Sequence, residues 1–142
     1  MIKILMSPLF SILFSTSALA ATHSSGGHLA FDGGRIHTHL SWIQEPSTDK
    51  EARMKLEWRD GATHKAMEPG LAFRVDLFMP DMGHGSAPTQ IAPWTDENGQ
   101  AALGAYQISN MYFMMAGSWE VRVTLTYADG STETQAWSLD VP

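Results

Sequence analysis

Apolar and polar residues alternate along most of the chain. In the range 36–42, Ile36, Leu40 and Trp42 share one parity, whereas His37 and His39 take the other. A period of two residues is typical of a β-strand with one buried face. The same alternation predicts further strands at 52–58, 71–79, 106–115, 119–127 and 133–141. No segment shows a sustained apolar period of 3.6 residues, so the pattern does not favour helices.

Turn-forming residues separate these strands. They lie at 45–51, 60–61, 116–117 and 128–131. Residues 81–100, rich in Gly, Pro, Ser, Asp and Asn, are long enough to be a functional loop. We expect two short additional strands near 29–31 and 90–94. Strands at a spacing of about ten residues predict an all-β protein, an immunoglobulin-like β-sandwich of about seven strands, with a small barrel as the alternative.

The first twenty residues have the features of a secretory signal peptide. Lys3 provides the positive start, Ile4 to Phe14 is apolar, and Ala18-Leu19-Ala20 is a small-x-small cleavage site. An uncleaved anchor is the alternative, but an apolar run of about eleven residues is shorter than the roughly 20 that span a bilayer. We therefore expect cleavage after Ala20, no stable membrane anchor and a periplasmic location.

Three domain ranges follow from these patterns. Residues 1–20 are the predicted signal peptide, and residues 21–34, small, polar and rich in Gly and Ser, are predicted to be a flexible N-terminal segment. Residues 35–142 form the predicted β-sandwich domain. This length is within the usual range for one domain with its own core.

Charge and cysteine content narrow the possible partners. The net charge is −6, and no cluster of Lys and Arg is present to follow a phosphate backbone, so nucleic acid is not an expected partner. The chain has no cysteine, although exported domains often carry disulfides. Nine methionines and six histidines are therefore the available soft and borderline metal ligands.

The densest group of such ligands is the stretch Met79-Pro80-Asp81-Met82-Gly83-His84-Gly85. It lies in the segment 79–86, which we call the Met/His loop. Thioether sulfur together with imidazole favours Cu(I) over Mg, Ca or Mn. Met79 continues the core parity of its strand, so we interpret it as a packing residue first and a ligand second. Met82 and His84 follow no core pattern, and the alternative for them is a solvated glycine-rich turn.

A second group of methionines, Met111, Met114 and Met115, lies beside the turn at 116–117. A strand end there could come close to the Met/His loop. Adjacent residues of a strand point to opposite faces, so at most one of Met114 and Met115 is expected to reach a metal without a bulge. The alternative for Met111 and Met115 is a place in the core.

Two further histidine arrangements could bind a metal. His37 and His39 form an i, i+2 pair on the outward face of a strand, although an exposed polar face is the simpler interpretation. Cleavage after Ala20 would place His23 third in the mature chain. An N-terminal amine, two amide nitrogens and that imidazole form a square-planar set suited to Cu(II) or Ni(II).

The sequence offers little for an enzyme. It has no cysteine nucleophile, no Gly-x-Ser-x-Gly, no His-Glu-x-x-His and no glycine-rich phosphate loop. Ser86, close to His84, does not make a triad without a geometric partner. We therefore expect a protein that is not an enzyme.

Two segments carry a family resemblance. LFMPDMGHGSAP (77–88) and GAYQISNMYFMMAGSWEVRV (104–123) resemble the FixH/YtkA-like group of exported or membrane-anchored bacterial proteins. The resemblance covers roughly the C-terminal half of the chain. It implies an immunoglobulin-type sandwich linked to copper handling, with Met82 and His84 as ligands and Met114 or Met115 as an added one.

Together these observations favour a periplasmic copper-binding carrier or chaperone. We expect it to hold Cu(I) through the Met/His loop, with a Cu(II) site at the N-terminus as a further hypothesis. Its expected partner is a protein that accepts or donates copper. The alternative is a β-sandwich interaction module that binds no metal and contacts a partner protein through its long loop.

Overall fold

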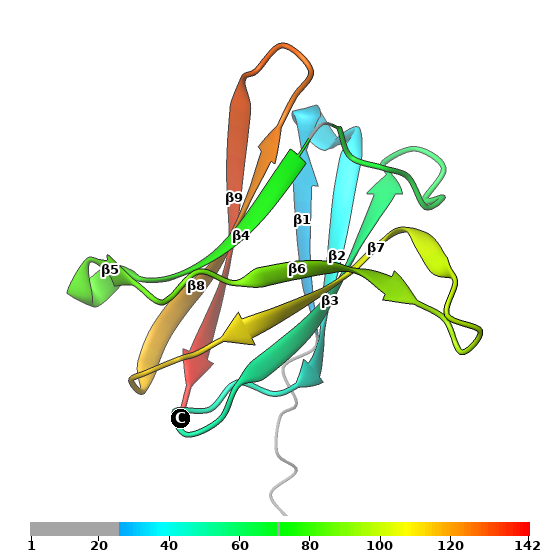
Figure 1. Cartoon of the computed structure of the whole chain (residues 1–142). Helices are drawn as coiled ribbons and strands as arrows, with labels where there is room; N and C mark the ends of the chain where they lie inside the picture. Colours follow the sequence, from blue (N-terminus) through cyan, green and yellow to red (C-terminus); the bar gives the residue numbers. More distant parts are fainter. Residues whose placement is uncertain (1–25, 71) are drawn as a thin grey trace, which may run out of the picture.

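Nine strands form two antiparallel sheets in the computed structural model, which describes residues 26–70 and 72–142 (Figure 1). The strands are β1 Gly27–Phe31, β2 Ile36–Gln44, β3 Ala52–Asp60, β4 Ala72–Met79, β5 His84–Gly85, β6 Gln90–Thr95, β7 Ala101–Met111, β8 Gly117–Thr126 and β9 Thr132–Val141. Two short 3-10 turns, η1 Asp32–Gly34 and η2 Pro80–Met82, join them. The predicted β-sandwich is confirmed.

The strand order identifies the type of sandwich. One sheet has the order β1-β2-β3-β7-β6 and the other β5-β4-β8-β9. Without the edge strands β1 and β5, these are the four-stranded and three-stranded sheets of a seven-stranded immunoglobulin-like domain. The chain crosses between the sheets after β3, after β5 and after β7.

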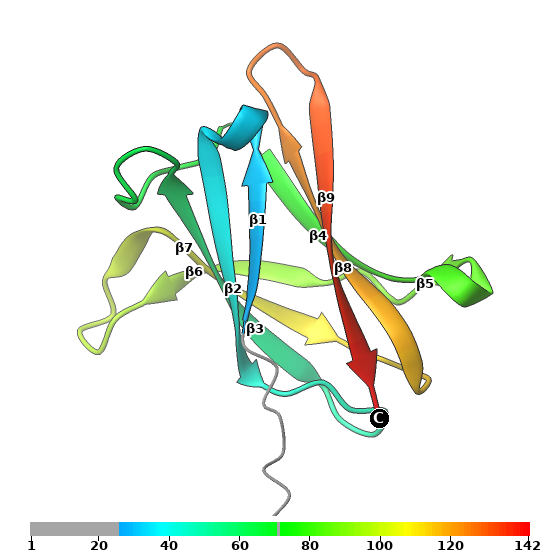
Figure 2. The same cartoon turned by 180° about the vertical axis from the view of Figure 1, so that it is seen from behind.

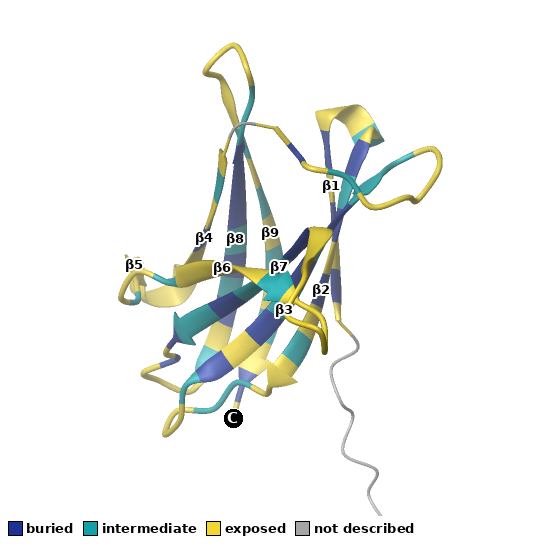
Figure 3. Ribbon diagram, turned by 45° about the vertical axis from the view of Figure 1, so that its right-hand side comes forward, coloured by how far each residue is buried: buried dark blue, intermediate teal, exposed yellow. Residues whose placement is uncertain are grey.

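The core fills the space between the sheets, and buried residues alternate with more exposed ones along the strands (Figure 3). Its largest fully buried side chains are Trp58, Trp119, Phe31 and Phe113. Each fully buried large apolar side chain contributes roughly 1.5–3 kcal/mol to the free energy of folding. The core is therefore built from apolar side chains of both sheets.

The N-terminal boundary of the sandwich differs from the prediction. The domain begins at Gly27, not at residue 35, because β1 pairs with β2 and buries Leu29 and Phe31. The short strand expected near 29–31 is therefore present, and residues 27–34 do not belong to a flexible segment. Gly27 lies against the ring of Trp137, leaving no room there for a Cβ atom.

Two other strand boundaries differ from the alternation pattern. The strand expected at 106–115 is β7, which begins at Ala101 and ends at Met111. Met114 and Met115 follow it in an irregular segment, so the argument that they point to opposite faces of a strand does not apply. The long loop expected at 81–100 contains β5 and β6, of which β6 was predicted at 90–94.

The N-terminal predictions fall on residues 1–25. The signal peptide, the cleavage after Ala20 and the site at His23 therefore lie outside the described residues. No helix within the described ranges is long and apolar enough to cross a membrane.

Candidate metal centre

The end of β4 and the start of β8 meet at one end of the sandwich. The two strands are antiparallel neighbours, and Phe78 pairs with Glu120 near the end of the ladder. The chain that leaves β4 and the chain that enters β8 therefore extend from neighbouring strands. These are the Met/His loop (79–86) and the Met segment (112–117), the two groups of ligands noted in the sequence.

The Met/His loop is a tight reversal of the chain. After η2, Gly83 has a φ of +65°, a left-handed conformation that glycine adopts without strain. Its N–H donates to the Met79 carbonyl oxygen at 2.9 Å. The reversal places His84 opposite Met79 in the short β4–β5 ladder.

The loop residues differ in exposure. The Met79 side chain is buried at 5% exposure, which confirms packing as its first role. Its terminal methyl group lies under Gly117, where an added Cβ atom would approach it to 2.8 Å. Met82 is 55% exposed and His84 is also exposed, so neither belongs to the core.

The Met segment is held in place by its neighbours. Phe113 is buried, and the Ser86 hydroxyl donates to the Tyr112 carbonyl oxygen at 2.6 Å. The indole Nε1 of Trp119 donates to the Met115 carbonyl oxygen at 2.8 Å. Met114 and Met115 are 68% and 42% exposed, so the core alternative for Met115 is wrong, whereas Met111 is fully buried.

The imidazole of His84 has two neighbours, the ring of Trp119 and the carbonyl oxygen of Gly85. Its ring packs edge-on against Trp119, with ring centroids 6.2 Å apart. Its Nδ1 lies 3.1 Å from the Gly85 carbonyl oxygen, which can only accept a hydrogen bond. In the neutral ring Nδ1 must therefore carry the proton, and the lone pair is on Nε2. A backbone acceptor on one ring nitrogen is the usual partner of a histidine that binds metal through the other.

A second group of imidazoles is carried by β1 and β2, which lie at one edge of the five-stranded sheet (Figure 2). His37 and His39 point outward as predicted, and His28 pairs with His39 across the ladder. Nε2 of His28 and Nδ1 of His37 are 3.3 Å apart. The His28 and His39 ring centroids are 4.9 Å apart. We call His28, His37 and His39 the imidazole face.

The surroundings of the imidazole face affect its charge. The pKa of His39 is lowered below its ordinary value, first by desolvation and then by the neighbouring His28 and Arg59. Glu57, directly opposite on β3, acts in the other direction. The lowered pKa favours the neutral form of this ring at neutral pH.

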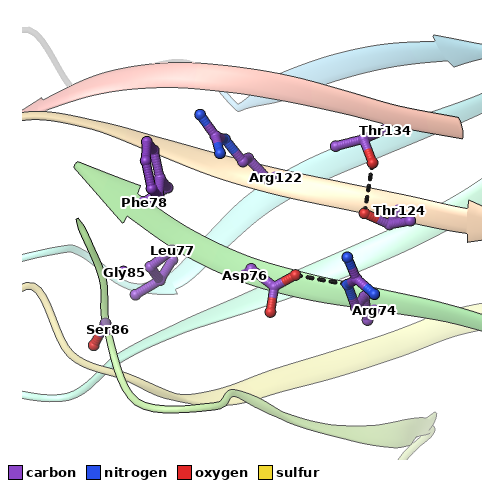
Figure 4. Close-up of a pocket in the computed structure, with 9 residues that line it drawn as sticks. All are labelled: Arg74, Asp76, Leu77, Phe78, Gly85, Ser86, Arg122, Thr124 and Thr134. Carbon is purple, nitrogen blue, oxygen red and sulfur yellow. Dashed lines mark hydrogen bonds and ion pairs between the residues drawn. The ribbon is translucent and has the colours of Figure 1, made fainter. Parts of the chain in front are cut away.

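A polar hollow of about 340 Å³ lies on the outer face of the four-stranded sheet (Figure 4). Its cationic groups already have partners. Arg74 Nε binds Asp76 at 2.9 Å, and the guanidinium of Arg122 stacks on Phe78 at 3.6 Å from the ring centroid. Arg122 Nε also donates to Glu120 at 2.7 Å, so both guanidinium groups have an acidic partner within the protein.

Within residues 26–70 and 72–142, no three His, Asp or Glu side chains already converge on one point where a metal ion could be held. Methionine sulfur is not one of the donor types in that statement, which therefore does not bear on the methionines of the Met/His loop. No protein-family model, curated protein or solved structure matches the chain.

Sequence reasoning missed three residues of these sites. His28 lies in the range expected to be flexible, and its pairing with His39 depends on the register of β1. Trp119 and Ser86 anchor the Met segment through hydrogen bonds to its backbone. Trp119 follows the core parity of its strand, which gave no sign of a second role at the site.

Proposed function

We propose that the protein is an exported copper carrier or chaperone that holds Cu(I) through Met82, His84 and one of Met114 and Met115. The observation that carries the proposal is the contact of the Met/His loop with the Met segment, joined by the Ser86–Tyr112 hydrogen bond. Through this contact, the segments that carry Met82, His84, Met114 and Met115 are neighbours at one end of the sandwich. Such a donor set favours Cu(I).

The exposure of the donors supports a carrier. Met82, Met114 and Met115 are three of the seven large apolar side chains that are exposed within the described part of the chain. Ligands at the surface let an acceptor protein approach the metal and exchange ligands with it. The resemblance of residues 77–88 and 104–123 to the FixH/YtkA-like group is consistent with copper handling. A periplasmic location and a Cu(II) site at His23 remain part of the proposal.

The rival function uses the same surface. Exposed methionines also suit a contact with a protein partner, because their flexible side chains adapt to different surfaces. An interaction module would need no metal. Copper binding by the isolated protein separates the two functions.

The test is the double substitution of Met82 and His84 by Ala, made in a His23→Ala background. Cu(I) affinity is measured under reducing conditions by competition with a chromophoric chelator. We expect the double variant to lose Cu(I) binding and to keep its β-sheet circular dichroism, because both side chains are exposed. His64→Ala, at an exposed histidine in the loop after β3, is the matched control and should bind as the parent does.

Two results would contradict the proposal. If the double variant keeps the parent's Cu(I) affinity, the loop does not hold the metal. If the parent itself takes up no Cu(I), the interaction module becomes the better function.

A further inference from the structure

The imidazole face is independent of the Met/His loop. It lies on β1 and β2 in the five-stranded sheet, whereas the loop extends the four-stranded sheet. His28, His37 and His39 point outward. The residues that follow them in the chain, Leu29, Thr38 and Leu40, are buried. Three imidazoles thus gather on one two-stranded ladder through the β1–β2 register.

The closest pair of nitrogens already has the separation of two metal ligands. Zn–N bonds of about 2.0–2.1 Å in a tetrahedron put two ligand nitrogens about 3.3–3.4 Å apart, and adjacent corners of a square plane lie closer, at about 2.9 Å. His28 Nε2 and His37 Nδ1 are 3.3 Å apart. In the free protein one ring donates to the other. A change of tautomer in the donor frees both lone pairs, and a rotation of the two rings is then needed to direct them to one metal ion.

The third imidazole lies next to this pair. His39 faces His28 across the ladder and its ring stands edge-on to that of His28, at an interplanar angle of 71°. Since the three rings do not yet converge, binding requires His39 to rotate about its side-chain bonds. His39 is exposed, so no core contact opposes that rotation.

The neighbouring charged groups leave the imidazoles as the principal donors. Glu57 faces His39 from β3, but its carboxylate is held by Lys55 at 3.1 Å and Arg59 at 3.4 Å. Arg59 faces His37 and also donates to the His64 carbonyl oxygen. No thioether or thiolate belongs to the imidazole face. An all-imidazole set suits borderline divalent ions and excludes the oxygen-preferring Mg and Ca.

We propose that His28, His37 and His39 form a divalent-metal site with a preference for Zn(II), distinct from the Cu(I) site. Three imidazoles with an open fourth position are a known zinc donor set. The site does not depend on the proposed copper function, because it shares no residue with the Met/His loop.

The test uses Zn(II) alone, titrated into the full-length exported protein in the His23→Ala background and followed by competition with a chromophoric indicator. We expect one Zn(II) per chain. His28→Ala, His37→Ala and His39→Ala should each weaken binding by more than about tenfold, since even outer-shell partners of metal ligands contribute 10–100-fold. Co(II) in place of Zn(II) should give the intense visible bands of tetrahedral coordination, lost in each variant.

Two controls define the site. Ser41→Ala removes an exposed polar side chain from the same strand, and His84→Ala removes the loop imidazole; both should bind Zn(II) as the parent does. Unchanged Zn(II) affinity in the three imidazole-face variants would overturn the proposal. Loss of Zn(II) binding in His84→Ala would also overturn it, by assigning the ion to the loop. Unchanged thermal unfolding of the metal-free variants establishes that lost binding is not lost folding.

Discussion

The indole Nε1 of Trp119 donates a hydrogen bond to the carbonyl oxygen of Met115, four residues earlier in the chain. The indole is itself 1% exposed and packs edge-on against Phe113, with ring centroids 5.4 Å apart. A rigid core residue therefore holds the backbone of an exposed methionine. The Trp119 ring, on β8, also packs edge-on against the imidazole of His84, on β5.

Replacing Trp119 by Phe tests this support. The variant keeps an aromatic ring but loses the hydrogen bond to Met115, which contributes about 1 kcal/mol. The matched control is Trp58→Phe, because Trp58 is equally buried and its Nε1 has no hydrogen-bond partner. In urea unfolding, Trp119→Phe should be less stable than Trp58→Phe by about 1 kcal/mol, and only Trp119→Phe should weaken Cu(I) binding. Equal copper affinities would mean that Trp119 has no positioning role.

Methionine-to-leucine substitutions separate sulfur chemistry from packing. Met82→Leu, Met114→Leu and Met115→Leu remove the thioether at exposed positions, so stability should change by less than about 0.5 kcal/mol. We expect Met82→Leu and one of the other two to weaken Cu(I) binding about tenfold or more. Met111→Leu, in the core, should leave Cu(I) affinity unchanged. Parent-like affinity in all three exposed variants would exclude thioether ligation.

Alanine substitutions at two glycines with similar backbone conformations distinguish the cost of backbone strain from the cost of a steric clash. Gly104 and Gly99 have φ values of +68° and +75°. A Cβ atom at Gly104 would lie 2.2 Å from the Met67 carbonyl oxygen, whereas one at Gly99 would meet nothing within 4 Å. Both Ala variants should lose about 1–2 kcal/mol from the left-handed conformation. Gly104→Ala should lose about 1–3 kcal/mol more, because a backbone oxygen cannot rotate away. Equal losses in chemical unfolding would show that the backbone relaxes there.

The half-buried carboxylate of Glu133, on strand β9, should make the stability of the fold sensitive to acid. Glu133 accepts hydrogen bonds from the Tyr127 hydroxyl and from the Asp32 backbone N–H, and these lower its pKa from 4.5. Since the folded-state pKa is below the unfolded value, the contribution to stability is complete above about pH 4.5 and is lost as the pH falls through the folded-state pKa. Glu133→Gln should therefore be less stable at pH 7 and show a shallower decline in melting temperature below pH 4.5. A parallel decline in both proteins would contradict the assignment.

The hydrogen bond between Tyr127 and Glu133 also makes the stability of the fold depend on pH in the alkaline range. Desolvation, followed by the Glu133 hydrogen bond, raises the pKa of Tyr127 from 10.0 to about 12. A raised folded-state pKa means that this stabilisation is complete below the unfolded value and is lost as the pH rises from about 10 towards 12. Tyr127→Phe should make the alkaline decline of stability shallower without abolishing it, because the pKa of Tyr106 is also raised to about 12, and thermal unfolding between pH 8 and 12 would measure this.

Local alternation was sufficient to predict most strands and the sandwich class. Ile36, Leu40, Met54, Leu56, Val121 and Val123 are buried as their parity predicts. Alternation reports on a buried face because successive side chains of a strand point to opposite sides. It failed at residues 112–115, where apolar residues continue after β7 has ended at Met111. There, apolar character came from exposed methionines and one buried Phe113 in an irregular segment.

The sequence by itself determined the chemistry of the candidate sites: soft ligands at 79–84 and 114–115, imidazoles at 37 and 39, and no thiolate. Only the tertiary structure decided which of the segments that carry these residues are neighbours. The pairing of β4 with β8 brings the Met/His loop to the Met segment, and the register of β1 on β2 adds His28 to His37 and His39. Strand pairing is settled by the burial of residues far apart in the chain, here Leu29 and Phe31 against the rest of the core. The alternation of apolar and polar residues along one strand does not specify which strand it pairs with.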